Sequence, residues 1–139
     1  NLIEENINPF RDNRNGTITD TRTNLTWQQH PDMMKMKWKK AIRYSKKLRL
    51  GSYNNWRLPT IDELKTLLKN HSFDDVLHGS ERPNLWLEKN GFKNIGQRFY
   101  WSSSKYSSAN YVWFIQSGNG GINIADIDED YNHYAICVR

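Results

Sequence analysis

The chain has 139 residues, which is enough for one hydrophobic core and short for two domains of ordinary size. Aromatic residues reach 13% of the sequence and include six Trp, so the core must rely on large rings. The single cysteine, Cys137, excludes an internal disulfide, a cysteine-based zinc site and a two-cysteine redox centre. No apolar run approaches the roughly 18 residues that would indicate a membrane-spanning helix.

The positive charge is concentrated in one stretch. Eight of the 20 basic residues lie between residues 35 and 49, and no acidic residue interrupts them. The other 12 basic residues are outnumbered by 15 acidic ones, so the remainder of the chain is net negative. A local basic face is therefore a better clue to a partner than the net charge of +5.

The first half of the chain predicts a hairpin and two helices. Asn15-Gly16 is a strong turn signal between β-forming segments, which predicts a β-hairpin or short meander over residues 11–28. Apolar residues at helical spacing predict a first helix over residues 34–50, with Gly51 as its stop. Thr60 and Glu63 form a capping box that predicts the start of a second helix.

The second half predicts strands after an irregular region. Residues 71–97 show no clear period and are expected to be loop, with one short turn near residues 85–87. Strands are expected over 99–102, 111–115, 121–124 and 133–138, and the middle two should form an antiparallel hairpin. Strands, two helices and further strands indicate an α+β domain over residues 1–139, with the helices packed on antiparallel strands.

Several separated sequence blocks together are specific to one family. They are Asn15-Gly16-Thr17-Ile18-Thr19-Asp20 with Leu25-Thr26-Trp27-Gln28, Trp38-x-x-Ala41, Asn55-Trp56-Arg57-Leu58-Pro59-Thr60-x-x-Glu63-Leu64, and Tyr100-Trp101-Ser102-Ser103-Ser104 with the ending Cys137-Val138-Arg139. In this order the chain resembles the Lcl C-terminal domain family, named for a bacterial collagen-like adhesin.

The resemblance implies a C-type-lectin-like fold, related to the formylglycine-generating enzyme fold, in which late strands and loops display a ligand surface. It also implies a cell-surface, periplasmic or secreted protein. Family members often carry a cysteine at the position of Ser45, apparently paired with the terminal one, and this chain lacks it. A secreted setting is less firmly supported for that reason. The cysteine pair of the formylglycine-generating relatives is missing too, which argues against their activity.

Other chemistry finds little support in the sequence. Cys137 and His133 are about 13 Å apart along a strand, too far for a nucleophile pair, so we expect no catalytic residues. The four histidines show no metal-ligand spacing. Asp126, Asp128 and Asp130 would share one face of an extended segment, where calcium binding or hydrolase-like acid catalysis is conceivable, but a solvated loop is favoured.

Two surfaces are candidates for ligand binding. The leading hypothesis is a non-catalytic module that binds a protein or glycan through the hairpin 111–124 and the loops 104–110 and 125–133. Its candidate residues are Lys105, Tyr106, Asn110, Tyr111, Trp113, Asn123, Asp126, Asp128, Asp130, Tyr131, Asn132 and His133. Among Tyr111 to Phe114, we expect Val112 and Phe114 to point inward and the two neighbours outward.

The alternative surface is the basic face of the first helix. Lys39, Lys40, Arg43, Lys46 and Lys47 fall within about a third of its circumference. Such a face binds sulfated glycan, anionic lipid or nucleic acid, although a solvated face is the simpler interpretation; a nucleic-acid module ranks lowest because known motifs are missing. A purely structural domain of a larger cell-surface protein also remains open.

Overall fold

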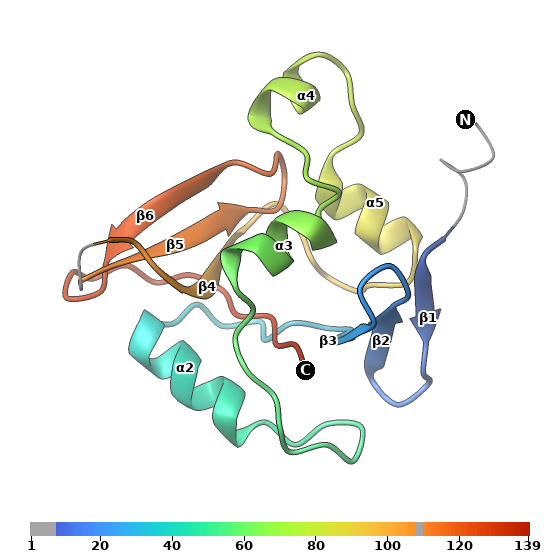
Figure 1. The fold of residues 1–139 in the computed structure, drawn as a ribbon, viewed down its shortest axis with the longest axis horizontal. Helices are drawn as coiled ribbons and strands as arrows, with labels where there is room; N and C mark the ends of the chain where they lie inside the picture. Colours follow the sequence, from blue (N-terminus) through green and yellow to red (C-terminus); the bar gives the residue numbers. More distant parts are fainter. Residues whose placement is uncertain (1–7, 108–109) are drawn as a thin grey trace.

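The computed structural model describes residues 8–107 and 110–139. In this part of the chain, two three-stranded antiparallel sheets and four helices form an α+β fold, as the sequence predicts. Figure 1 shows the two sheets on opposite sides of the molecule, with helix α3 and the C-terminus between them. The first core cluster contains Ile18 and Trp27 from one sheet together with Tyr100 and Ile115 from the other, so the two sheets share a core.

The first sheet confirms the predicted meander. Strands β1 (Phe10–Asp12), β2 (Thr17–Asp20) and β3 (Leu25–Gln28) pair in chain order, and Ile18 lies opposite Trp27. Gly16 has φ of 87°, a left-handed conformation that glycine adopts without steric cost, which explains the Asn-Gly turn.

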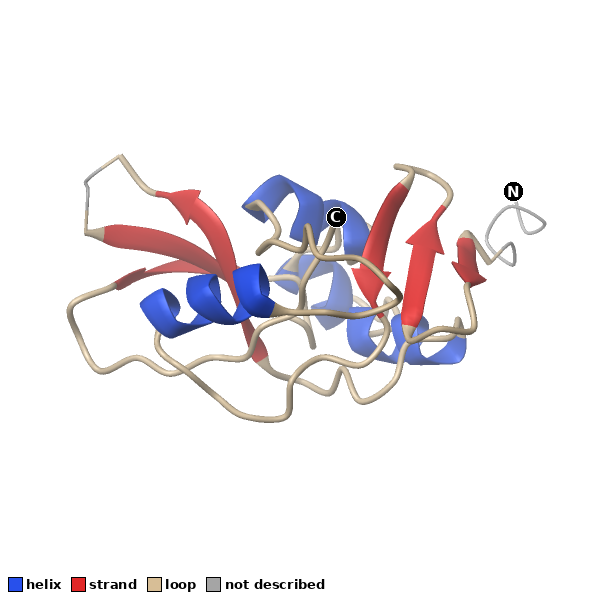
Figure 2. Ribbon diagram, turned by 90° about the horizontal axis from the view of Figure 1, so that it is seen from below, coloured by secondary structure: helices blue, strands red, loops and turns tan. Residues whose placement is uncertain are grey.

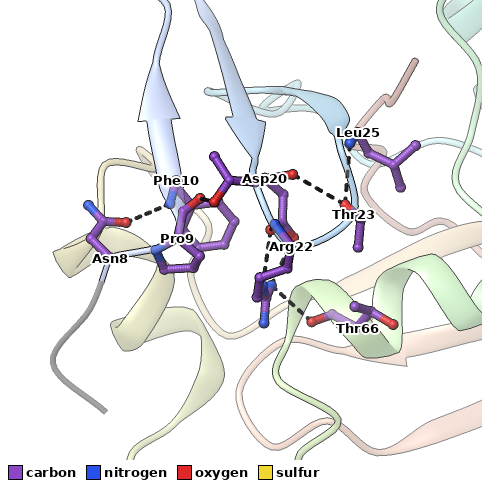
Figure 3. A network of polar contacts seen from close by, with 9 residues as sticks. Asn8, Pro9, Phe10, Asp20, Arg22, Thr23, Leu25 and Thr66 are labelled. Atoms are coloured by element: carbon purple, nitrogen blue, oxygen red, sulfur yellow. Dashed lines mark hydrogen bonds and ion pairs between the residues drawn. The ribbon is translucent and has the colours of Figure 1, made fainter. Parts of the chain in front are cut away.

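Arg22 pairs with a buried carboxylate and joins this sheet to helix α3 (Ile61–Leu67), as Figure 3 shows. Asp20 is almost fully buried and accepts two side-chain hydrogen bonds from Arg22, at 3.0 and 2.8 Å. The same guanidinium donates to the Thr66 carbonyl at 3.2 Å and lies over the rings of Phe10 and Trp86. Arg22 thus connects three elements that are distant in sequence.

Helix α2 (Trp38–Lys47) is shorter than predicted at both ends. It cannot begin earlier because Met36 forms two backbone hydrogen bonds with His133, at 2.8 and 3.0 Å, which hold that residue extended. Met34, the first apolar residue of the predicted helix, lies outside α2 and is 67% exposed. Gly51 does not end the helix; it lies in the tight turn Leu50–Tyr53 with φ of 63°.

The predicted capping box of α3 is present in both directions. The Glu63 amide donates to Thr60 Oγ1 at 3.1 Å, and the Thr60 amide donates to the Glu63 carboxylate at 2.8 Å. Arg57 adds two hydrogen bonds to that carboxylate, at 2.7 and 2.8 Å, and lowers its pKa. Trp56 and Leu58 are buried, so this segment forms a structural corner before the helix.

The prediction that residues 71–97 form a loop is wrong. This region contains α4 (Phe73–Leu77) and α5 (Pro83–Lys89). Ser72 and Asp75 form a capping box that starts α4, and Pro83 occupies the first turn of α5. Both helices are too short to show a convincing apolar period, but their start signals are local and visible in the sequence.

The second sheet contains β4 (Phe99–Lys105), β5 (Tyr111–Gln116) and β6 (Ile122–Asp126) in antiparallel order. Both of its faces pack against other parts of the fold. Val112 belongs to a core cluster with Met36 and Ala41 on the α2 side, whereas Ile115 belongs to the cluster that contains Leu64 of α3. Figure 2 shows α2 in front of this sheet, seen from below.

The predicted strand over 133–138 does not join either sheet as a regular strand. Its residues form single bridges to four different segments, with Met36, Tyr100, Trp27 and Arg57 as partners. The C-terminal segment therefore connects the two sheets and α2. None of the helices in residues 8–107 and 110–139 has the length and apolar composition needed to cross a lipid bilayer.

Candidate functional site: a row of basic concavities

Helix α2 presents its cations to solvent. Ala41 and Ser45 are buried beneath the helix, and the five predicted residues of the basic face are all exposed: Lys39, Lys40, Arg43, Lys46 and Lys47. The fully buried Ser45 donates its hydroxyl to the Ile42 carbonyl at 2.7 Å, so this polar side chain is satisfied beneath the helix.

Three adjacent concavities follow the basic stretch, and together they define what we call the basic row. The first, about 450 Å³, is lined by Lys40, Arg43, Tyr44, Lys47, Leu48 and Arg49. The second, about 470 Å³, is lined by Lys35, Met36, Lys37, Lys39, Lys40, Arg43 and Asn132. The third, about 530 Å³ and named here the terminal pocket, is lined by Lys35, Gln97, Arg98, Phe99, Asn132, His133 and Tyr134.

Neighbouring concavities of the row share walls. Lys40 and Arg43 line both the first and the second, and Lys35 and Asn132 line both the second and the terminal pocket. The combined lining contains eight cationic side chains and no carboxylate: Lys35, Lys37, Lys39, Lys40, Arg43, Lys47, Arg49 and Arg98. Lys46, although part of the predicted basic face, lines none of these three concavities.

Little acidic charge neutralises the row. Among the described residues, the basic stretch forms one ion pair, between Lys37 and Asp130 at 3.5 Å, and both of these side chains are exposed. An exposed pair of this kind contributes at most about 1 kcal/mol and is screened by salt, so Lys37 remains accessible to another anion. The row therefore has an excess of positive charge that is not used for folding.

The chain positions the terminal pocket through backbone hydrogen bonds. The Tyr134 amide donates to the Phe99 carbonyl at 2.9 Å, and the Trp101 amide donates to the Tyr134 carbonyl at 3.0 Å. The reciprocal bonds between Met36 and His133 hold the residue after Lys35 against the same segment. Three parts of the chain that are distant in sequence are thus fixed around one cavity.

His133 lies in an aromatic cluster at the edge of this pocket. Its ring centroid is 4.4 Å from those of Trp101 and Phe114 and 5.3 Å from that of Phe99. Burial lowers the pKa of its imidazole to about 4, so the ring is neutral at pH 7. Its buried Nε2 has no hydrogen-bond partner among the described residues.

The predicted hairpin surface is only partly assembled. Tyr111 is 36% exposed and Trp113 is half-buried on the face of β5 that also carries Ile115, and Tyr106 packs edge-on against Trp113 with centroids 5.4 Å apart. Val112 and Phe114 point to the α2 side, as expected. Asn123 lies opposite Phe114 and is therefore on the other face from Tyr111.

The remaining candidates of this surface fall in different places. Lys105 extends over the Trp38 ring at 5.8 Å, and Asn110 is exposed at the end of the loop whose residues 108–109 lie outside the described part. Tyr131 is exposed, whereas Asn132 and His133 belong to the terminal pocket. The structure thus divides the predicted set between two faces of the molecule.

The three aspartates do not follow the extended geometry on which the calcium hypothesis depended. Asp126 ends β6, and its carboxylate accepts the Asp128 amide at 2.9 Å, which turns the chain. Asp128 and Asp130 are exposed in the segment that follows. Across residues 8–107 and 110–139, no three His, Cys, Asp or Glu side chains are grouped so that they could hold a metal ion.

Cys137 lies in the core, fully buried and free. Its amide donates to Gln28 Oε1 at 2.9 Å, and the Gln28 amide group donates to the Tyr44 hydroxyl at 2.6 Å. Burial raises the pKa of the Cys137 thiol, so the thiolate needed for nucleophilic chemistry is disfavoured.

Sequence reasoning missed several residues of the row: Tyr44, Leu48, Gln97, Arg98, Phe99 and Tyr134. Tyr44 and Leu48 were detectable, because Tyr44 lies one helical turn after Lys40 and Leu48 lies one turn after Tyr44. Arg98 and Phe99 carried no such signal, since their neighbours in the pocket come from residues 35 and 132–134.

A comparison with known protein families matches residues 16–139 to the Lcl C-terminal domain. No curated protein matches the chain.

Proposed function

Because the chain belongs to the Lcl C-terminal domain family, we propose that it is a non-catalytic binding module whose basic row binds a polyanionic glycan, such as a sulfated one. Family membership indicates a bacterial domain of a larger protein. The C-type-lectin-like architecture and a cell-surface, periplasmic or secreted location, both implied by the family, are part of the same proposal.

One observation carries this proposal: eight cations line three connected concavities that contain no carboxylate. A solvated surface normally intersperses charges of both signs, and this chain has 15 acidic residues that could serve that purpose. Cations that are not neutralised by nearby carboxylates raise the local concentration of anionic ligands and accelerate their association.

The shape of the row suits an extended ligand better than a single ion. A polyanion that crosses several concavities can engage a series of cations, each contributing a modest and salt-sensitive energy. Helix α2 supplies a rigid base of 10 residues, about 15 Å long, along which such a chain can be followed.

Binding of heparin as a model sulfated chain tests the proposal. The variant Lys40→Gln, Arg43→Gln and Lys47→Gln removes three exposed cations of the row. At about 1 kcal/mol for each cation near an anionic surface, its affinity should fall roughly a hundredfold at low salt. Raising the salt concentration should remove most of the difference in heparin affinity between the wild type and this variant.

A matched control carries the same loss of charge elsewhere. Arg11→Gln, Arg14→Gln and Lys93→Gln change three exposed cations outside the three concavities. Its affinity for heparin should stay within about threefold of wild type, a difference below 1 kcal/mol. Equal losses in the two triple variants would show that binding follows net charge alone, and the proposal would be rejected.

A second candidate is recognition of a protein or glycan through the hairpin face. It is favoured by the exposed rings of Tyr106 and Tyr111 beside Trp113, because aromatic rings of this kind are frequent binding anchors. The double variant Tyr106→Ala and Tyr111→Ala should reduce the affinity for a protein or glycan ligand without changing the salt dependence of binding. A ligand whose binding is lost only in the triple variant of Lys40, Arg43 and Lys47 would favour the first candidate.

A further inference from the structure

The terminal pocket differs from the other two concavities of the row because it combines cations with an exposed ring. Phe99 is 44% exposed, and its ring is fixed edge-on against Phe114 and His133, with both centroid distances at 5.3 Å. An accessible ring that is already held in one orientation offers an apolar platform, because little side-chain entropy is lost when a ligand binds to it. The apolar face of a sugar ring fits such a platform.

Two cations reach this pocket from different segments. Lys35 is exposed, and Arg98 is half-buried with its guanidinium over the Tyr134 ring, 4.7 Å from the centroid. Arg98 Nη1 donates to the Asn94 carbonyl at 2.7 Å, which holds the guanidinium in place. Within the described part of the chain, neither cation forms an ion pair with a carboxylate.

The remaining wall is polar and uncharged. Gln97 and Asn132 bring side-chain amides, each of which can donate and accept hydrogen bonds. These are the groups that recognise hydroxyls, whereas a simple anion site would need only the cations. Cations, amides and a ring in one concavity of about 530 Å³ match the size and chemistry of a small-ligand site.

His133 supplies an independent observation. The residue is 7% exposed, it lines the pocket, and its buried Nε2 lacks a hydrogen-bond partner among the described residues. A buried unpaired nitrogen costs stability, and a phenyl ring would fill the same aromatic cluster without that cost. Packing alone therefore does not account for an imidazole at this position.

We propose that the terminal pocket binds an acidic monosaccharide unit, a sugar ring that carries a carboxylate or a sulfate. The ring lies against Phe99, and the acidic group is directed to Lys35 and Arg98. This inference rests on the proposed function, because the pocket would hold one unit of the polyanionic chain while the rest of the chain follows α2.

Titration of the isotopically labelled domain with glucuronic acid, glucose 6-sulfate and glucose tests the inference by NMR. Amide signals of residues 97–99 and 132–134 should shift. At least one acidic sugar should bind about tenfold more tightly than glucose, as expected for one charge-assisted contact, and the comparison of the two separates carboxylate from sulfate recognition.

Substitutions separate the contributions of charge and ring. Lys35→Gln should reduce the affinity for the acidic sugar about tenfold and bring it close to that for glucose. Phe99→Ala should weaken all three sugars. Lys46→Gln is the matched control, since it removes another exposed cation, one that lies outside the row, and should change nothing.

The inference is overturned by equal affinities for glucose and both acidic sugars, by shifts confined to α2, or by a Lys35→Gln variant that binds like wild type. Heparin binding distinguishes this failure from failure of the proposed function. If heparin binds and depends on Lys40, Arg43 and Lys47 while no acidic sugar enters the pocket, only the present inference fails. If heparin binding is insensitive to those cations, the proposed function fails.

Discussion

Replacing Gly120 by alanine should destabilise the domain more than any ordinary surface substitution. Gly120 lies in the turn between β5 and β6 with φ of 77°, and a Cβ built there overlaps the carbonyl oxygen of His71 and lies 2.7 Å from its carbonyl carbon. The left-handed backbone costs alanine about 1 kcal/mol, and displacing a backbone carbonyl adds roughly 1–3 kcal/mol. The unfolding free energy should therefore fall by about 2–4 kcal/mol.

Gly79 supplies the control for the cost of placing alanine in a left-handed backbone conformation. It has φ of 97°, and a Cβ there meets no atom within 4 Å, so Gly79→Ala carries the conformational cost alone. In thermal unfolding followed by circular dichroism, Gly120→Ala should lower Tm by about 8–16 °C and Gly79→Ala by about 4 °C. Equal shifts in the two variants would refute the close approach of the β5–β6 turn to His71.

Three further predictions concern single interactions. Thr60→Ala removes the acceptor of the Glu63 amide and should cost about 1 kcal/mol in urea denaturation; an unchanged midpoint would argue against the cap. Arg22→Met leaves the buried Asp20 unpaired and should cost about 3 kcal/mol, much of which Asp20→Asn in the same chain should restore. The unfolded chain protonates His133 near its ordinary pKa of 6.5, whereas in the folded domain the pKa of this imidazole is about 4. The free energy of unfolding should therefore fall as the pH decreases from 6.5 to about 4. His133→Phe should flatten this part of the pH profile of Tm.

The parts of the fold that were predictable depend on short-range signals. The Asn15-Gly16 turn and the box of Thr60 and Glu63 are complete within a few residues, so distant packing cannot change their meaning. Helix α4 begins with the same device, Ser72 and Asp75, and was missed because five helical residues give no measurable apolar period. The start signal was the more reliable evidence there.

The unpredictable parts depend on partners that lie far apart in sequence. Residues 133–138 have the composition of a strand, yet each bridge they form engages a different segment. The alternation of apolar and polar residues within such a segment cannot reveal that its partners are Met36, Tyr100, Trp27 and Arg57. The shortened start of α2 has the same origin, since the bridge to His133 holds Met36 out of the helix.

The candidate site shows a similar division. The exposed cations of α2 follow from helical geometry, because residues that share a face can be read from their spacing. The terminal pocket does not, because most of its wall is built from residues 97–99 and 132–134. The sequence could thus place the cations on one helix face, whereas the shape of the terminal pocket depends on contacts between segments that are distant in sequence.

These contacts also change the relation between the two surfaces considered at the outset. The basic helix and the loop 125–133 are separate in sequence, but Asn132 lines both the second concavity and the terminal pocket, and Lys37 pairs with Asp130. The backbone bonds between Met36 and His133 fix one surface to the other. Substitutions in the loop should consequently alter polyanion binding, although the loop itself is acidic. The cations of α2 and the C-terminal segment therefore belong to one continuous surface.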